Sequence, residues 1–287
     1  MIRLISAELF KLRKRTMTRV LLYILIGIII LLYLLLLAVS NANLPDMGPG
    51  MEGIPNLLGL PVALPFAMFI LSDFGASLAI VLAASVMGNE YNWRTIRTAV
   101  VSSESRFKLL GAKLIAITIF VLFGMLIGLV AGFVMSLFTT AIGGYKYDFS
   151  FFTGSYLWHQ FLQFWRTFFV LIPYTLLGFM FAIIGRSAMP GIASGIGIMF
   201  LERIIATFMF LAGGWIAEVP SYLLYANVQA ITSLAGLPDW FGTGMGGGGA
   251  TSMQWPSVPH AVITLTIYSI VFLFVSFYLF RERDVTG

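Results

Sequence analysis

The side chains that could do chemistry are few, and the most informative are ionisable residues inside apolar stretches. Asp73 lies in one such stretch, and Glu202 and Arg203 are neighbours in another. A charge at the centre of a bilayer costs from ~3 to more than ~10 kcal/mol, so these residues either pair or line a path. Adjacent residues on a helix point about 100° apart, so Glu202 and Arg203 cannot both face one partner. The pattern predicts a structural pair between Asp73 and Arg203, or else an ion or substrate path.

The sequence contains no recognisable catalytic centre. His159 and His260 stand alone, cysteine is absent, and no His/Asp/Glu cluster has metal-ligand spacing. The Walker lysine motif, the dinucleotide glycine fingerprint and the nucleophile elbow are also missing from the sequence. We therefore expect no catalytic residue, no metal and no bound cofactor in this chain.

The composition is that of an integral membrane protein. Hydrophobic residues make up 59% of the chain and charged residues only 10%, against about a quarter charged in soluble domains. The net charge of +5 could suggest a nucleic-acid partner. Most Lys and Arg, however, fall in segments assigned to one side of a membrane, as topology requires, so we expect no nucleic acid.

Six apolar stretches predict an all-α protein with six transmembrane helices. Short loops rich in Lys and Arg stay inside, which places both termini in the cytoplasm. The membrane is expected to be a cell membrane of prokaryotic type. A very tight turn is expected at residues 186–190. The predicted spans are 20–40, 62–87, 114–140, 161–185, 191–216 and 258–280, and together residues 20–287 form one membrane domain.

Residues 1–19 predict an amphipathic helix that lies in the lipid headgroups. Ile2, Ile5, Leu9 and Leu12 recur at helical spacing, and cations occupy the rest of the surface. A signal peptide fits less well, because the apolar run that follows is longer than a signal core. Residues 217–259 carry no Lys or Arg and predict an external segment that is either a disordered connector or a lid containing a short helix.

Residues 88–113 form a polar island between two apolar runs, and we expect this island to lie in water as a cytoplasmic loop. Its sequence, GNEYNWRTIRTAVVSSESRFKLLGAK, resembles the loop between the second and third spans of permeases of the type-2 class of ATP-binding cassette exporters. Arg94 and Ser103 depart from the pattern, which usually has glycine and often proline there. The matching residues are Glu90, Tyr91, Thr95, Arg97, Ser105, Arg106 and Lys113.

The resemblance implies a permease that exports a hydrophobic or amphipathic compound. It implies a cytoplasmic ATP-binding subunit that carries ATP and magnesium, and a second permease copy or a sister permease. Within the loop, Ile96, Ala99 and Val100 recur at helical spacing, which suits a short helix that an ATPase grips. The expected ATPase contacts are Glu90, Tyr91, Thr95, Ile96, Arg97 and Arg106.

Two other functions remain open from the residues alone. One is an ion-coupled secondary transporter that uses Asp73, Glu202 and Arg203, although no internal repeat is visible. The other is a membrane scaffold without transport. For a permease, few polar residues are available inside one bundle, so we expect the route to lie between two copies, with spans two and five as its wall. The small residues of these spans either permit that interface or only tighten packing within one chain.

Overall fold

The structure, a computed structural model, describes residues 1–41, 59–92, 106–143, 149–235, 237 and 255–282. Within these ranges the regular secondary structure is helical. Six helices are long and apolar enough to cross a membrane, as predicted, because lipid leaves backbone groups no partner outside the helix itself. They are α2 (Thr16–Asn41), α4 (Ala63–Asn92), α6 (Arg106–Ile142), α7 (Gly154–Ile184), α8 (Ala188–Ala212) and α11 (Val258–Glu282).

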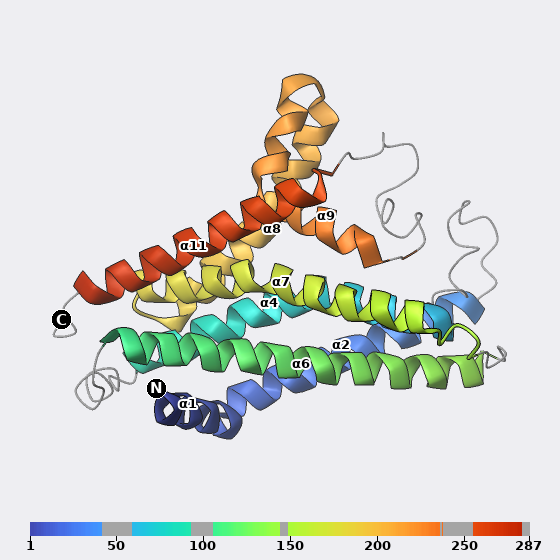
Figure 1. Cartoon of the computed structure of the whole chain (residues 1–287), viewed down its shortest axis with the longest axis horizontal. Helices are drawn as coiled ribbons and strands as arrows, with labels where there is room; N and C mark the ends of the chain where they lie inside the picture. The colour runs from blue at the N-terminus through green and yellow to red at the C-terminus, as the bar shows by residue number, and fades with distance from the viewer. Residues whose placement is uncertain (42–58, 93–105, 144–148, 236, 238–254, 283–287) are drawn as a thin grey trace.

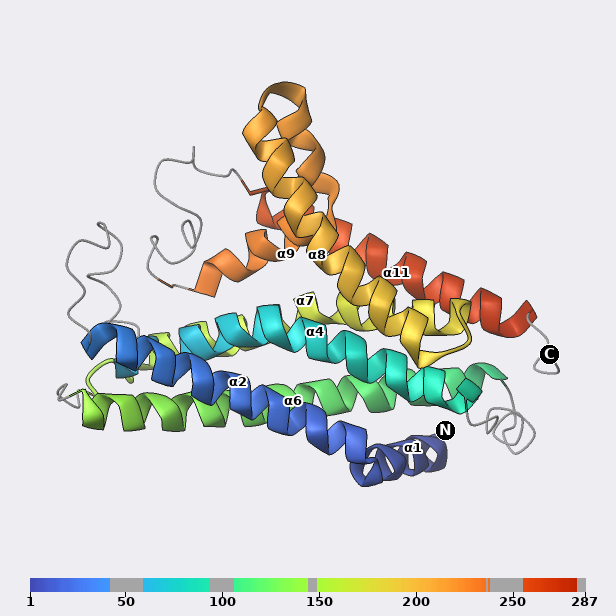
Figure 2. The same cartoon turned by 180° about the vertical axis from the view of Figure 1, so that it is seen from behind.

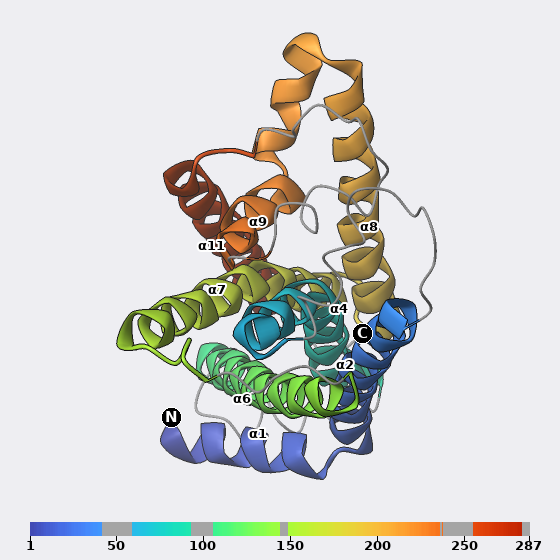
Figure 3. The same cartoon turned by 90° about the vertical axis from the view of Figure 1, so that its right-hand side faces the viewer.

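The N-terminal amphipathic helix is a separate element. It is α1 (Ile2–Lys14), and it ends where Arg15 adopts an extended backbone, so the first spanning helix begins at Thr16 and not after residue 19. Leu12 is buried on its apolar face, which packs against α6. Figure 3 shows α1 running across the direction of the long helices. This is the orientation that an interfacial helix requires.

The centre of the bundle is formed by α4 and α7, which are largely buried and run in the same direction. Near the start of α7, the hydroxyl of Tyr156 donates to the carbonyl of Pro61 at 2.9 Å. Near its end, a Cβ added to Gly178 would lie 2.7 Å from the carbonyl oxygen of Ile80, so glycine is needed for this contact. Helices α2 and α6 pack on one side of the pair, and α8 and α11 on the other (Figure 3).

The predicted tight turn joins α7 to α8 at residues 185–187. Arg186 has a φ of 50°, a left-handed conformation that few residues other than glycine adopt. The turn rests directly on α4, since a Cβ added to Gly88 would lie 2.0 Å from the backbone nitrogen of Ala188. Gly88 therefore fixes how closely the turn approaches α4.

Helix α8 leans away from the other long helices, and its far end stands apart from them (Figures 1 and 3). It ends at Ala212 and not at residue 216 as predicted, because Gly213 and Gly214 both have positive φ and redirect the chain. A run of 3₁₀ helix, η3 (Gly214–Tyr222), follows. Large apolar side chains such as Phe208 are exposed on this arm.

After η3 the chain returns to the bundle as α9 (Leu224–Thr232), which packs against α7, α8 and α11 (Figure 2). Most of its side chains are buried, and the amide of Asn227 donates to the carbonyls of Ser221 and Leu223 at 2.8 and 2.7 Å. The first half of the predicted external segment is therefore a packed helix and not a disordered connector. The glycine-rich second half lies mostly outside the described residues.

Candidate functional site

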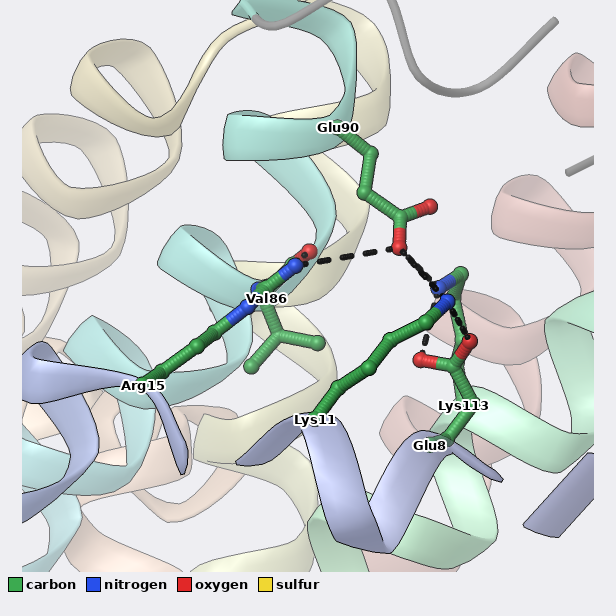
Figure 4. A network of polar contacts seen from close by, with 6 residues as sticks. All are labelled: Glu8, Lys11, Arg15, Val86, Glu90 and Lys113. Atoms are coloured by element: carbon green, nitrogen blue, oxygen red, sulfur yellow. Dashed lines mark hydrogen bonds and ion pairs between the residues drawn. The ribbon is translucent and has the colours of Figure 1, made fainter. Parts of the chain in front are cut away.

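Side chains of α1, α4 and α6 form an ion cluster (Figure 4). The cluster lies at the end of the bundle where α1 is placed. Glu8 comes from α1, Glu90 from the last turns of α4, and Lys113 from the beginning of α6. The ammonium of Lys113 donates to Oε2 of Glu8 at 2.8 Å and also pairs with Oε1 of Glu90. Glu8 is 4% exposed, Glu90 2% and Lys113 1%, so Lys113 is a buried cation between two buried carboxylates.

Two further cations complete the cluster from α1 and the break that follows it. Nζ of Lys11 lies 2.7 Å from Oε1 of Glu8 and 4.0 Å from Oε1 of Glu90. Nη2 of Arg15 lies 3.9 Å from Glu90, and its Nη1 donates to the carbonyl of Val86 at 3.4 Å. The α1 end of the chain is thereby bonded to the ends of both α4 and α6.

The charges in this cluster stabilise one another. Burial by itself raises the pKa of the Glu8 carboxyl, but Lys113 and Lys11 outweigh burial, so the pKa of Glu8 is lowered. Buried charges persist in proteins only when they are paired and hydrogen-bonded. The Glu8 carboxylate therefore stays charged at neutral pH, and the cluster acts as an anchor between α1 and the other two helices.

This arrangement corrects the prediction for residues 88–113, which was wrong at both ends. Helix α4 continues to Asn92 and α6 begins at Arg106, so only residues 93–105 separate the two helices. Glu90 and Lys113 are buried and not in water, because they neutralise each other and Glu8 beneath α1.

The other expected ATPase contacts fall in different places. Tyr91 is partly buried against the apolar cluster around Met87, and Arg106 is the first residue of α6. Thr95, Ile96 and Arg97 lie outside the described residues. With its carboxylate turned towards α1, Glu90 is not accessible to another protein in this arrangement.

The second polar site is the predicted pair of ionisable residues in the spans. Nη1 of Arg203 in α8 lies 3.8 Å from Oδ2 of Asp73 in α4, so the pairing is confirmed within one chain. The pair is loose, since charge-assisted hydrogen bonds are about 2.7–2.9 Å long. The side chain of Arg203 is 49% exposed and that of Asp73 is 25% exposed. The guanidinium also lies over the ring of Tyr225, at 5.7 Å from its centroid.

Glu202 takes a different partner, as expected from the angle between neighbouring helical residues. Its Oε2 accepts a hydrogen bond from the backbone nitrogen of Tyr225 at 3.1 Å, in the first turn of α9. A carboxylate is favoured there because the first amides of a helix have no intrahelical partner. Glu202 thus fastens α9 to α8, while Arg203 faces Asp73.

Asp73, Arg203 and Tyr225 line a small cavity of about 20 Å³ between α4, α7, α8 and α9. We call it the Asp73 pocket. Its walls combine the charged pair with aromatic and other side chains: Ser72, Asp73, Ala76, Tyr174, Met199, Phe200, Arg203, Tyr225, Val228 and Gln229.

A comparison with protein-family models decides the family. The model described as "Protein of unknown function (DUF2705)" matches residues 24–286, which is most of the chain. The chain belongs to the DUF2705 family. It is also 25% identical over 217 residues to the "Uncharacterized protein YhcI" of Bacillus subtilis (strain 168), over 72% of this chain. The chain spans 64% of the length of that relative.

Two members of these sites in this DUF2705 chain were not found by sequence reasoning. Glu8 is the single acid of the basic N-terminal helix, and its spacing of three from Lys11 was the available signal. Tyr225 lies in the predicted external segment, and nothing in its sequence neighbourhood indicates contact with Arg203. Both became visible only when α1 and α9 were placed against the bundle.

Proposed function

We propose that this chain is the membrane permease subunit of an ATP-binding cassette exporter. A separate cytoplasmic subunit would hydrolyse ATP, and the pair would move a hydrophobic or amphipathic compound out of the cytoplasm. In this proposal the protein lies in the plasma membrane, and α1, the end of α11 and residues 93–105 face the cytoplasm. Figures 1 and 2 place α1 and the end of α11 at the same end of the bundle, which agrees with this topology.

The observation that carries the proposal is the ion cluster beside residues 93–105. Glu90 and Lys113 lie just before and after this segment, both match the exporter pattern, and the structure pairs them. Through Glu8 the same cluster holds α1. A push on residues 93–105 would therefore reach α4, α6 and α1 together, which a permease driven by another subunit requires. In this proposal Glu90 positions the contact segment, and Arg97 remains the candidate contact.

The proposed route lies between two copies, with α4 and α8 as its wall. Two observations qualify the role of the small residues. Gly195 packs inside the chain, since an added Cβ would lie 2.5 Å from Ile80, whereas a Cβ added to Gly197 would meet no atom of the described residues within 4 Å. The hydroxyl of Ser77 also approaches the sulfur of Met199 at 3.8 Å, between α4 and α8 of one chain. Gly195 thus serves packing within one bundle, and Gly197 is left for a contact between copies.

The test uses the tagged chain purified from its native membrane. We expect the eluate to contain ATP hydrolysis that vanadate inhibits, although the chain itself has no nucleotide motif. Arg97→Ala should lower the ATPase activity that copurifies while the amount of permease in the membrane stays constant. Arg3→Ala is the matched control, because Arg3 is an exposed cation of α1. Absence of any copurifying ATPase, or equal loss in both variants, would reject the assignment.

A second candidate function is ion-coupled secondary transport, and the Asp73–Arg203 pair favours it because ionisable residues within spans often mark ion paths. The two candidates differ in their energy source. Transport by sealed membrane vesicles that stops on ATP depletion but survives collapse of the proton gradient favours the exporter, and the reverse favours the secondary transporter. No transport under either condition, with every substrate tried, favours a scaffold.

A further inference from the structure

The Asp73 pocket contains two groups that attract cations, and a cationic side chain of the protein itself lies near both. The Arg203 guanidinium is 3.8 Å from the carboxylate of Asp73 and 5.7 Å from the centroid of the Tyr225 ring. Carboxylates attract cations through charge, and aromatic faces do so through the ring quadrupole. Neither attraction requires a hydrogen bond from the bound cation, and the 3.8 Å separation of Arg203 from Asp73 exceeds hydrogen-bond length.

The remaining walls suit an organic cation that carries methyl groups. Tyr174 is almost completely buried, and Met199 adds a polarizable thioether that adapts to varied shapes. On the α8 side, the lining residue Phe200 and the nearby Ile204 are each 51% exposed. An apolar tail attached to the cation could therefore lie along this face in the lipid.

We propose that the Asp73 pocket binds the cationic head group of an amphipathic compound, and that Arg203 occupies the place of this head group when the pocket is empty. The cavity of about 20 Å³ is too small for such a group while Arg203 is in place. Arg203 is therefore a competitor that must swing out, which its half-exposed side chain permits. This inference deepens the proposed export function, because a displaced Arg203 needs the polar surroundings that a transport route supplies.

The local charge decides between a cationic and an anionic ligand. Asp73 is the acid and Arg203 the base in the pocket walls. Glu202 is bonded to the first turn of α9 and is not among the lining residues. Once Arg203 leaves, the pocket presents Asp73 and aromatic rings, which attract a cation and repel an anion. A quaternary ammonium fits this pocket better than a primary amine, because it has no N–H donors that would need partners.

The test measures binding to the purified chain in a nonionic detergent, without ATP or any partner. The probes are decyltrimethylammonium, decylphosphocholine and decyl sulfonate, which share a tail and differ in head-group charge. Binding is followed by tryptophan fluorescence, because the ring of Trp255 lies 6.0 Å from that of Tyr225, and Trp255→Phe shows how much of the signal is local.

We expect the cationic probe to bind most tightly, and Asp73→Asn to weaken it roughly tenfold. Arg203→Met should do the opposite and strengthen binding by roughly tenfold, because it removes the competitor. The cationic probe should also raise the melting temperature of Arg203→Met more than that of the wild type. Arg166→Met is the matched control, since Arg166 is a span arginine outside the pocket, and it should change neither quantity.

Three results would overturn the inference. Arg203→Met could weaken cation binding as Asp73→Asn does, which would make the pair purely structural. Decyl sulfonate could bind best and lose affinity in Arg203→Met, which would make Arg203 an anion-binding residue. Decylphosphocholine could bind best and need both residues, which would indicate a zwitterionic ligand. Because no ATPase is present, these results are independent of the copurification test of the export function.

Discussion

Replacing Lys113 by methionine is the sharpest test of the ion cluster. Methionine keeps much of the side-chain volume but removes the buried cation that pairs with both Glu8 and Glu90. Glu8 would keep Lys11 at 2.7 Å, whereas the cations of Lys11 and Arg15 lie 4.0 and 3.9 Å from Glu90. Breaking a buried pair from one side costs ~3–5 kcal/mol, and the near-complete burial of Lys113 places this variant in that range.

Lys11→Met is the matched control. Its side chain is 47% exposed, and Glu8 would retain Lys113, so we expect a loss of only ~0–1 kcal/mol. The double variant Glu90→Gln with Lys113→Met should recover much of the loss of Lys113→Met, because it also removes the α4 carboxylate that loses the Lys113 cation.

The assay is thermal unfolding in detergent, followed by tryptophan fluorescence and supported by trypsin digestion at the cations of α1. Lys113→Met should melt well below Lys11→Met and should release α1 to the protease. Equal melting temperatures for the two variants, or an additive loss in the double variant, would refute the claim that this cluster holds α1 to α4 and α6.

Three further predictions follow from the packing and the charges. Gly88→Ala should prevent the α7–α8 turn from packing on α4, since its Cβ would meet backbone at 2.0 Å, and it should cost ~3 kcal/mol or more of stability. Gly197→Ala has open space for the added Cβ and should be neutral in the same melting assay. Neutralising either Asp73 or Arg203 alone should cost ~1–3 kcal/mol, because the pair is partly exposed, and the double variant should cost less than the sum; additive losses would exclude the pair. The lowered pKa of Glu8 contributes stability that is present above the ordinary pKa of 4.5 and is lost as the pH falls through the lowered pKa. The melting temperatures of wild type and Glu8→Gln should therefore converge in acid. A difference between the two melting temperatures that is independent of pH would contradict the shift.

The six spans and the amphipathic helix could be predicted from the sequence because the reasons for them are local. A long run of apolar residues has to be helical in lipid, where the backbone finds no other partners. The spacing of Leu12 and its neighbours in α1 fixes an apolar face whatever the helix packs against. The span boundaries were less accurate, since α8 ends at Gly213 through a backbone conformation that glycine permits but does not require.

The Asp73–Arg203 pair was also within reach of the sequence. Each charge is too costly to leave alone in an apolar stretch, and few partners exist at similar depth. The third ionisable residue, Glu202, was separated from the pair by helix geometry alone, but its partner was not predictable. The backbone of Tyr225 meets Glu202 only because η3 turns the chain back towards the bundle.

The ion cluster was decided by tertiary structure. In sequence Glu90 and Lys113 stand near the two ends of a polar stretch, and charges in such stretches usually lie in water. They are buried here because α1 lies across the ends of α4 and α6 and brings Glu8 to Lys113, far along the chain. The same holds for the glycines, since Gly88 and Gly197 both lie in helices, yet an added Cβ would meet backbone at Gly88 and no atom of the described residues within 4 Å at Gly197. Sequence spacing determines which residues share a face of one helix, and only the placement of a second helix decides whether that face meets water, lipid or an opposite charge.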